Sequence, residues 1–104
     1  MDANKYLPLT ESTFYILLSL DEPRHGYGIM QRVSEMSDGE VRIGPGTLYG
    51  AFNMLEKQKL IAMVREEDRR KIYALTTEGR TVLQAQLART RRLLDNAGWL
   101  AQNG

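Results

Sequence analysis

The stretch from residue 44 to residue 75 constrains the fold of this chain more than any other part of it. It opens with Gly44-Pro45-Gly46, and proline suits the first turn of a helix because the amide hydrogen it lacks has no intrahelical partner there. Leu48, Phe52 and Leu55 follow at spacings of four and three residues. This spacing predicts a helix that turns these three side chains inward.

The opposite side of this helix carries residues that are short, polar or cationic: Thr47, Gly50, Asn53 and Lys57. A side of this kind fits the major groove of DNA, where the base edges present donors and acceptors. An isolated amphipathic helix more commonly has such a face because it is simply solvated. The residues that follow this helix favour the interpretation as a face that enters the major groove over that as a solvated face.

Two short strands are predicted next, over residues 60–65 and 71–75, joined by a loop over residues 66–70. Ile61 and Met63 alternate with their neighbours in the first strand, as β-structure favours. An isolated hairpin is marginally stable, so packing on the preceding helix must support it. A groove-fitting helix beside a hairpin with a cationic turn predicts a winged helix-turn-helix, mainly α with a small β-hairpin.

Two helices are predicted before this stretch. Thr10 is placed to cap the first helix, which should end near Pro23 because proline disfavours helix in the residue before it. A turn over Arg24-His25-Gly26 leads to a second helix with apolar residues at helical spacing, and Gly39 is a suitable stop.

A long final helix is predicted after Thr76 or Thr77. Its apolar positions keep alternating steps of four and three residues, a seam of nearly three heptads: Leu83, Leu87, Thr90, Leu94, Ala97 and Ala101. A lone helix of this length cannot hide such a seam, so something must cover it.

The composition excludes several classes of protein for this chain. The 104 residues suit one domain with at most one appended element. No cysteine is present, which excludes a disulfide scaffold and a thiolate metal site and is compatible with a reducing cytoplasm. The longest apolar run is too short for a membrane span, and no signal peptide is evident at the N-terminus. We expect a cytoplasmic protein without a membrane partner.

Charge is distributed unevenly along the chain. Residues 1–41 carry three Lys/Arg and seven Asp/Glu, whereas residues 42–104 carry eleven and six, giving −4 and +5. A polyanionic partner should therefore meet the second portion. Chance clustering of charges on a small protein is the alternative.

Enzymatic and metal chemistry lack support. His25 is the only histidine and has no acidic cluster near it in sequence, so a turn residue is its simplest interpretation. The serines have no histidine at motif spacing, and Gly44-Pro45-Gly46 lacks the Lys-Ser/Thr ending of a P-loop. We expect no catalytic residues, no metal site, no cofactor and no enzymatic activity.

These elements, in this order, resemble the PadR family of bacterial transcriptional regulators over roughly residues 7–95. The matching motifs are Leu9-Thr10-Glu11, His25-Gly26-Tyr27-Gly28, Gly46-Thr47-Leu48-Tyr49, Leu55-Glu56-Lys57 with Leu60-Ile61, and Arg70-Lys71-Ile72-Tyr73-Ala74-Leu75-Thr76 with Gly79. The resemblance implies a homodimer that binds a palindromic operator, usually represses, and releases DNA when a small molecule binds. It implies a winged helix-turn-helix DNA-binding domain over 1–76 and a C-terminal dimerisation helix over 77–104, with Leu83, Leu87, Thr90, Leu94 and Ala97 at the interface.

Three departures from the family pattern stand out. Gly50 lies where many members have proline, and glycine inside a helix costs roughly 1 kcal/mol relative to alanine. Close approach of the backbone to DNA is one use for it. The loop over residues 66–70 is short for the family. Some members stack planar drugs between tryptophans midway along the last helix, where this chain has Thr90, whereas its single tryptophan is Trp99.

The expected DNA contacts fall into two groups. Thr47 and Asn53 are the candidates for base edges, beside Gly46 of the same motif. Tyr27 and Tyr49 could direct their hydroxyls at phosphate, or could be half-buried aromatic residues. Lys57 is either a phosphate contact or a solvated lysine.

Three adjacent cations, Arg69, Arg70 and Lys71, are the main phosphate candidates in the hairpin. The alternative is charge balance against Glu66, Glu67 and Asp68, which would give weak surface pairs. With three phosphate contacts per subunit, a dimer would neutralise roughly six charges and its affinity would fall with salt with a log–log slope of about −5.

We therefore expect a sequence-specific DNA-binding transcriptional regulator, a ligand-responsive repressor acting as a homodimer on double-stranded operator DNA. The alternatives are a small-molecule-binding dimer with weak or no specific DNA binding, and a protein-interaction module that uses the heptad seam. Trp99 could cover an effector cavity between subunits, for a small aromatic effector still to be identified, or it could seal the seam.

Overall fold

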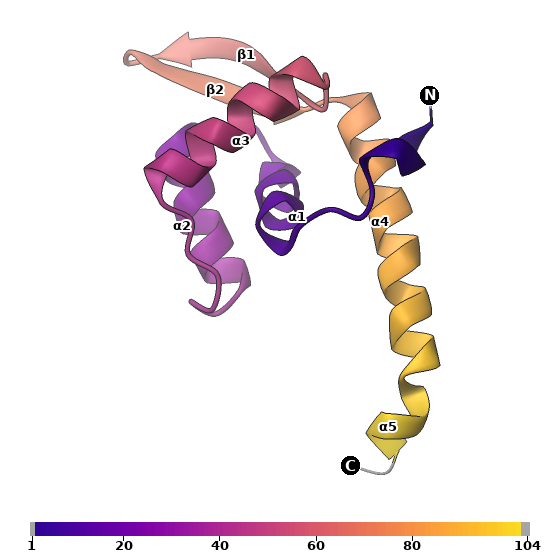
Figure 1. The fold of residues 1–104 in the computed structure, drawn as a ribbon. Coiled ribbons are helices and arrows are strands. Elements are labelled where there is room, and N and C mark those ends of the chain that lie inside the picture. The colour runs from indigo at the N-terminus through magenta and orange to yellow at the C-terminus, as the bar shows by residue number, and fades with distance from the viewer. Residues whose placement is uncertain (1, 103–104) are drawn as a thin grey trace.

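The computed structural model describes residues 2–102, and their side chains up to residue 100. Along the chain the elements are η1 (Ala3–Tyr6), α1 (Glu11–Leu18), η2 (Ser19–Asp21), α2 (Gly26–Met36), α3 (Pro45–Lys57), β1 (Ile61–Glu67), β2 (Arg70–Leu75), α4 (Thr77–Asn96) and α5 (Gly98–Gln102). Figure 1 shows α1, α2, α3 and the hairpin gathered into one body, from which α4 and α5 extend as an arm. This is a winged helix-turn-helix with a C-terminal helical extension, the fold class predicted from the sequence.

The predicted helix starts are correct. The Thr10 hydroxyl accepts the backbone N–H of Thr13 at 3.1 Å, and the Thr76 hydroxyl accepts that of Gly79 at 2.9 Å. Pro45 occupies the first turn of α3. Gly39 follows α2 with φ of +79°, a conformation that glycine adopts without strain.

The hydrophobic core joins the three helices of the body to the sheet and to the first part of α4. Apolar residues at helical spacing in each helix meet there, and together they exclude water from one contiguous cluster. Leu48, Phe52 and Leu55 of α3 are buried, as predicted. The buried cluster is completed by Ile16, Leu17, Leu20, Ile29, Val33, Ile43, Leu60, Ile61, Tyr73 and Val82.

The hairpin differs from its prediction. Both strands are longer, because Glu67 pairs with Arg70, and the turn is therefore only Asp68-Arg69 rather than a loop over residues 66–70. These two residues have φ of +49° and +65°. Positive φ at both central positions is the type I′ geometry, whose twist matches that of the flanking strands. Strand pairing therefore takes up residues that lack any strand signal in the sequence.

The predicted alternation along β1 is wrong. Only Ile61 is buried in this strand, and Met63 and Val64 are about half exposed. A register shift between Met63 and Arg65 leaves Val64 without a partner, which is a β-bulge. The bulge interrupts the period of two on which the prediction depended.

The segment between η2 and α2 pairs with the two-stranded sheet through one isolated β-bridge. Arg24 and Tyr73 exchange both backbone hydrogen bonds, at 3.0 and 2.9 Å. The sequence indicated only a turn here. This bridge ties the start of α2 directly to the hairpin.

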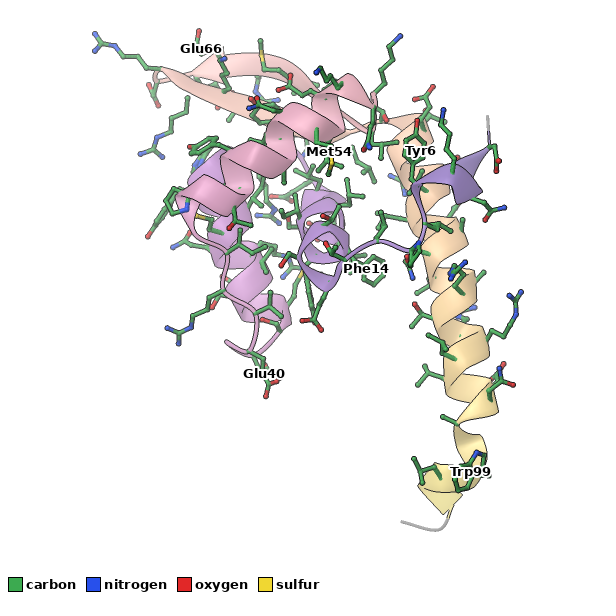
Figure 2. All side chains as sticks on the ribbon, in the orientation of Figure 1. Tyr6, Phe14, Glu40, Met54, Glu66 and Trp99 are labelled. Carbon is green, nitrogen blue, oxygen red and sulfur yellow. The ribbon has the colours of Figure 1, made fainter. Side chains whose placement is uncertain are left out.

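The arm is held to the body by the N-terminal segment. Gln86 of α4 is buried, and its side-chain oxygen accepts the backbone N–H of Leu9 at 2.7 Å. Beyond this contact α4 leaves the body, and Figure 2 shows Trp99 at the far end of the molecule from Glu66 near the hairpin tip.

The predicted seam is not continuous. α4 ends at Asn96, Ala97 is its C-cap, and α5 begins at Gly98, so Ala97 and Ala101 do not continue the heptads of one helix. The side chain of Ala101 lies outside the described residues. Leu83 and Thr90 are half-buried within the chain itself, whereas Leu87 and Leu94 are exposed, together with Leu93, Trp99 and Leu100.

Candidate nucleic-acid interface

The face of α3 that points away from the core is fully accessible. Burial of Leu48, Phe52 and Leu55 turns the other side of the helix to solvent. The predicted contact residues Gly46, Thr47, Asn53 and Lys57 are all exposed there, together with Gly50. Their contact with DNA stays a prediction.

Two glycines on this side of α3, Gly46 and Gly50, place no side chain on it. Beyond its chain neighbours and the backbone of its own helix, a Cβ atom added at Gly46 or at Gly50 would meet no atom within 4 Å. Gly50 also has no positive φ, so its backbone does not require glycine. Nothing inside the fold therefore accounts for glycine at position 50, where alanine would favour the helix by roughly 1 kcal/mol.

A groove separates α3 from the hairpin and reaches the start of α2. We call it the wing groove; its volume is about 590 Å³. Six of the predicted DNA contacts line it, from three different elements: Tyr27, Tyr49, Asn53, Arg69, Arg70 and Lys71. The rest of the lining is His25, Gly26, Phe52, Glu56, Glu66 and Tyr73. Gly46, Thr47 and Lys57 are on the exposed side of α3 but are not part of this lining.

Tyr49 is held over the first turn of α2. Its ring lies edge-on to Phe52 with 5.7 Å between ring centroids. Its hydroxyl sits so close to Gly26 that a Cβ there would be 3.0 Å from it. Tyr49 is 54% exposed, so this side chain is both packed on one side and open to the groove on the other.

Tyr27 is more exposed, at 59%. Its hydroxyl accepts a hydrogen bond from Nε2 of Gln31 at 3.3 Å. Its ring lies nearly parallel to that of His25, with 6.5 Å between the centroids. The side chain is thus a surface residue and not a half-buried one.

Aromatic packing closes the floor of the wing groove. Phe52 and Tyr73 are almost completely buried, and their ring centroids are 4.4 Å apart. Burial raises the pKa of the Tyr73 phenol above its ordinary value, and the Glu56 carboxylate and Tyr49 raise it further. The floor therefore stays uncharged while the rim carries cations.

The three wing cations are not neutralised by their acidic neighbours in sequence. Within residues 2–100, the ion pair of the hairpin joins Arg65 to Glu67, and none reaches Arg69, Arg70 or Lys71. Arg69, Arg70 and Lys71 are all exposed. The local charge balance considered as an alternative is therefore not formed by these three side chains.

His25 has a structural place that the sequence analysis missed. Its Nδ1 accepts the backbone N–H of Gly28 at 3.1 Å and so caps α2. Its Nε2 lies 3.2 Å from Nη1 of Arg70 in the wing. Histidine is not among the preferred N-cap residues, and the proximity to Arg70 depends on the tertiary fold, so no local signal could have revealed either contact.

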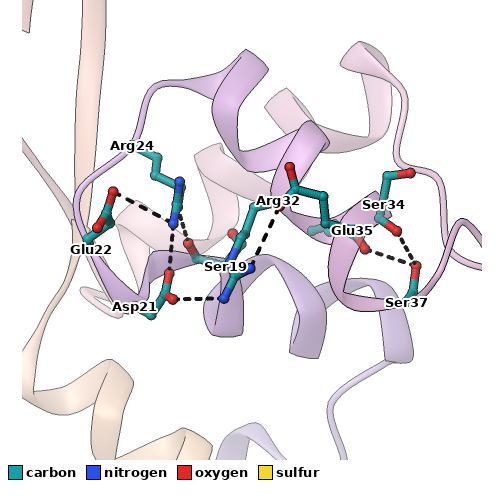
Figure 3. A network of polar contacts seen from close by, with 9 residues as sticks. Ser19, Asp21, Glu22, Arg24, Arg32, Ser34, Glu35 and Ser37 are labelled. Atoms are coloured by element: carbon teal, nitrogen blue, oxygen red, sulfur yellow. Dashed lines mark hydrogen bonds and ion pairs between the residues drawn. The ribbon is translucent and has the colours of Figure 1, made fainter.

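A network of charges fixes α2 relative to the bridge with the hairpin (Figure 3). The carboxylate of Asp21 accepts hydrogen bonds from Arg24 and from Arg32, each at 3.1 Å. Arg24 also donates to the carbonyl oxygen of Ser19 at 2.8 Å. Burial alone would raise the pKa of Asp21, but the two arginines outweigh it and hold this pKa below 3.8.

A metal site and a membrane span are not apparent in the part of the chain that the structure covers. No cluster of three or more side chains suited to a metal ion occurs among residues 2–100. Likewise, no described helix is both long enough and apolar enough to cross a membrane.

Comparison with known proteins identifies the family. The model of the transcriptional regulator PadR-like family matches residues 16–85. The transcriptional regulator YqjI of Escherichia coli is 33% identical over 63 residues, which cover 61% of this chain and 30% of YqjI. A 37.1 kDa protein of unassigned role in transposon TN4556 of Streptomyces fradiae is 37% identical over 73 residues, 70% of this chain and 21% of that protein. The chain therefore spans less than a third of each of these two relatives.

Solved structures agree with this assignment. A transcriptional regulator from Clostridium thermocellum superposes with a TM-score of 0.71 at 25% identity, covering 94% of this chain and 96% of that one. A PadR family transcriptional regulator from Eggerthella lenta gives a TM-score of 0.69 at 28% identity, over 98% and 87% of the two chains. Members of the matched family are transcriptional regulators and not enzymes. On its sequence match, its fold and its solved neighbours, this chain belongs to the PadR-like family of transcriptional regulators.

Proposed function

We propose that this protein is a DNA-binding repressor that acts as a homodimer on a palindromic operator. The observation that carries the proposal is the wing groove, which brings Tyr27, Asn53 and Arg70 together from α2, α3 and β2. Cations on the rim and a bare helix face beside them suit phosphate and base edges respectively. In this arrangement α3 enters the major groove and the wing (residues 61–75) contacts the flanking backbone.

The fold supports a proposal for the separate roles of the two parts of the chain. Residues 1–76 form the DNA-binding domain, and residues 77–104 provide the dimerisation arm. Leu87 and Leu94 of α4 are exposed, as are Trp99 and Leu100 of α5. Such apolar side chains on a protruding arm favour burial against a second copy. A two-fold dimer would place its half-sites about 10 base pairs apart, centre to centre.

A salt titration of DNA affinity tests the wing directly. The purified protein first selects its operator from a library of random duplexes. The double variant Arg70→Ala/Lys71→Ala should bind this operator more weakly, and its log–log salt slope should be shallower by about 3 to 4, because four cations per dimer no longer displace counterions. Lys5→Ala is the matched control, since it removes an exposed cation of η1 outside the wing groove.

Three results would count against the proposal. Failure of the wild-type protein to select any duplex would remove DNA binding. An unchanged slope in the double variant would remove the wing from the interface. Sedimentation of the free protein as a monomer at micromolar concentration would remove the homodimer.

The second candidate is a small-molecule-binding dimer whose DNA surface is vestigial. Two carboxylates in the wing groove, Glu56 and Glu66, favour it because they oppose phosphate there. An electrophoretic shift assay on the DNA upstream of the protein's own gene separates the two functions. A shift at low salt supports the repressor, and its reversal by small aromatic compounds would identify an effector. Trp99 fluorescence reports whether such a compound binds near α5.

A further inference from the structure

The two contacts of His25 cannot both be hydrogen bonds accepted by a neutral imidazole. Its Nδ1 accepts from Gly28, and its Nε2 faces Nη1 of Arg70. A neutral imidazole has one acceptor nitrogen, and a guanidinium can only donate. Because the cap of α2 occupies the acceptor nitrogen, Nε2 carries the hydrogen atom.

Two donors therefore converge at the edge of the wing groove. Nε2 of His25 and Nη1 of Arg70 are 3.2 Å apart, and in this tautomer both nitrogens are donors. Arg70 makes no ion pair with the described carboxylates. One anionic oxygen could accept from both groups and so replace an unfavourable approach of two donors with two charge-assisted hydrogen bonds.

The wing groove holds further donors near this pair, beside the carboxylates of Glu56 and Glu66. In the described chain the backbone N–H groups of Gly26 and Tyr27, at the start of α2, have no hydrogen-bond acceptor. The Tyr49 hydroxyl lies against Gly26. These donors line the same groove as His25 and Arg70.

We propose that His25 and Arg70 jointly bind one phosphodiester group of the DNA backbone, with Nε2–H of His25 donating to it. The cap on α2 sets the tautomer and the orientation of the ring, so the same histidine that starts the helix also presents its second nitrogen to phosphate. This inference rests on the proposed DNA-binding function and adds His25 to its contacts.

The variant His25→Asn separates the two roles of this side chain. Asparagine is a preferred N-cap residue, so α2 keeps its cap, but the shorter side chain places no donor beside Arg70. We expect an unchanged melting temperature and a loss of operator affinity of about tenfold or more, as for removal of a hydrogen bond to a charged group. His25→Ala, which loses the cap as well, should lower both the melting temperature and the affinity.

Operators with a single neutral methylphosphonate identify the phosphate. At one position in each half-site, the methylphosphonate should weaken binding of the wild-type protein. The same methylphosphonate should weaken binding of His25→Asn and of Arg70→Ala much less. Equal sensitivity of wild-type protein and His25→Asn at every position overturns the inference, as does wild-type affinity in His25→Asn. Failure of the wild-type protein to bind any duplex would instead overturn the proposed function.

The tautomer can be measured in the free protein because the chain has one histidine. In an ¹⁵N-labelled sample the imidazole should show a protonated, pyrrole-like Nε2 and an unprotonated, pyridine-like Nδ1. The opposite assignment would mean that Nε2 accepts from Arg70, and the pair would then be a satisfied internal contact with no need of an anion.

Discussion

Gly79 lies directly against the backbone carbonyl group of Leu60. A Cβ atom at position 79 would overlap the carbonyl oxygen of Leu60 and would come within 2.7 Å of Cδ1 of Leu75. The same carbonyl accepts the backbone N–H of Thr76 at 3.1 Å. The first turn of α4 is therefore built on the turn between α3 and β1, which sets the direction of the arm relative to α3.

Gly79→Ala should destabilise the protein by about 1–3 kcal/mol, the usual cost of overpacking a site that cannot relax. Relaxation would require α4 to move away from Leu60 and to lose the hydrogen bond from Thr76. Urea unfolding followed by circular dichroism measures the change. Stability equal to or above that of the wild-type protein would show that α4 can shift freely on the body.

Gly50→Ala should have the opposite effect on stability. A Cβ at this position meets no atom within 4 Å, so the helix should gain up to about 1 kcal/mol. We expect operator affinity to fall at the same time, because the added methyl group stands on the face that we propose to approach DNA. Unchanged or tighter binding would mean that the duplex does not come close to α3 at this residue. Gly79→Ala is the matched comparison, because it adds the same methyl group but should lower the stability where Gly50→Ala should raise it.

The turn residue Arg69 combines a strained backbone with a cation. Its φ of +65° is unfavourable for a residue with a side chain and unstrained for glycine. Arg69→Gly should therefore be more stable than Arg69→Ala by about 0.5–1 kcal/mol. Both variants lose the same charge, so both should make the log–log salt slope of operator binding shallower by about 2 per dimer. Different slopes in the two variants would show that the turn conformation, and not the charge, governs binding.

The ion pairs of Asp21 predict an acid-sensitive contribution to stability. The arginine partners hold the folded-state pKa of Asp21 below its ordinary value of 3.8. A depressed pKa stabilises the fold above the unfolded-state value, and this contribution is lost as the pH falls through and below 3.8. Because Asp21 is about half exposed, its contribution should not exceed about 1 kcal/mol.

Asp21→Asn should lower the free energy of unfolding at pH 7 by up to about 1 kcal/mol. The free energy of unfolding of this variant should also fall less steeply with decreasing pH than that of the wild-type protein. Glu22→Gln is the matched control, because Glu22 makes one longer contact, at 3.7 Å, and is more exposed. It should change neither the stability at pH 7 nor the acid limb measurably. Identical pH profiles of Asp21→Asn and the wild-type protein would show that the network in Figure 3 does not contribute to folding.

Features set by local chemistry could be predicted from the sequence alone. Helical periodicity placed Leu48, Phe52 and Leu55 in the core and left Asn53 on the surface. Capping at Thr10 involves groups only three residues apart. These features do not depend on contacts between distant segments. The family resemblance followed from the order of these features along the chain.

Contacts between distant segments were decided by the tertiary structure. The pairing of Glu67 with Arg70 shortened the turn to two residues and lengthened both strands. The bridge between Arg24 and Tyr73 brought the start of α2 to the wing. That bridge also sets His25 beside Arg70, although 45 residues separate them. The sequence by itself thus determined which side of α3 is buried, because a repeat of 3.6 residues is a local property. It did not determine which side of α4 packs on the body, where Val82 and Gln86 are buried and Leu87 is exposed. Only the packed fold decided which polar groups meet across the wing groove, because that depends on strand register and on contacts that no local pattern encodes.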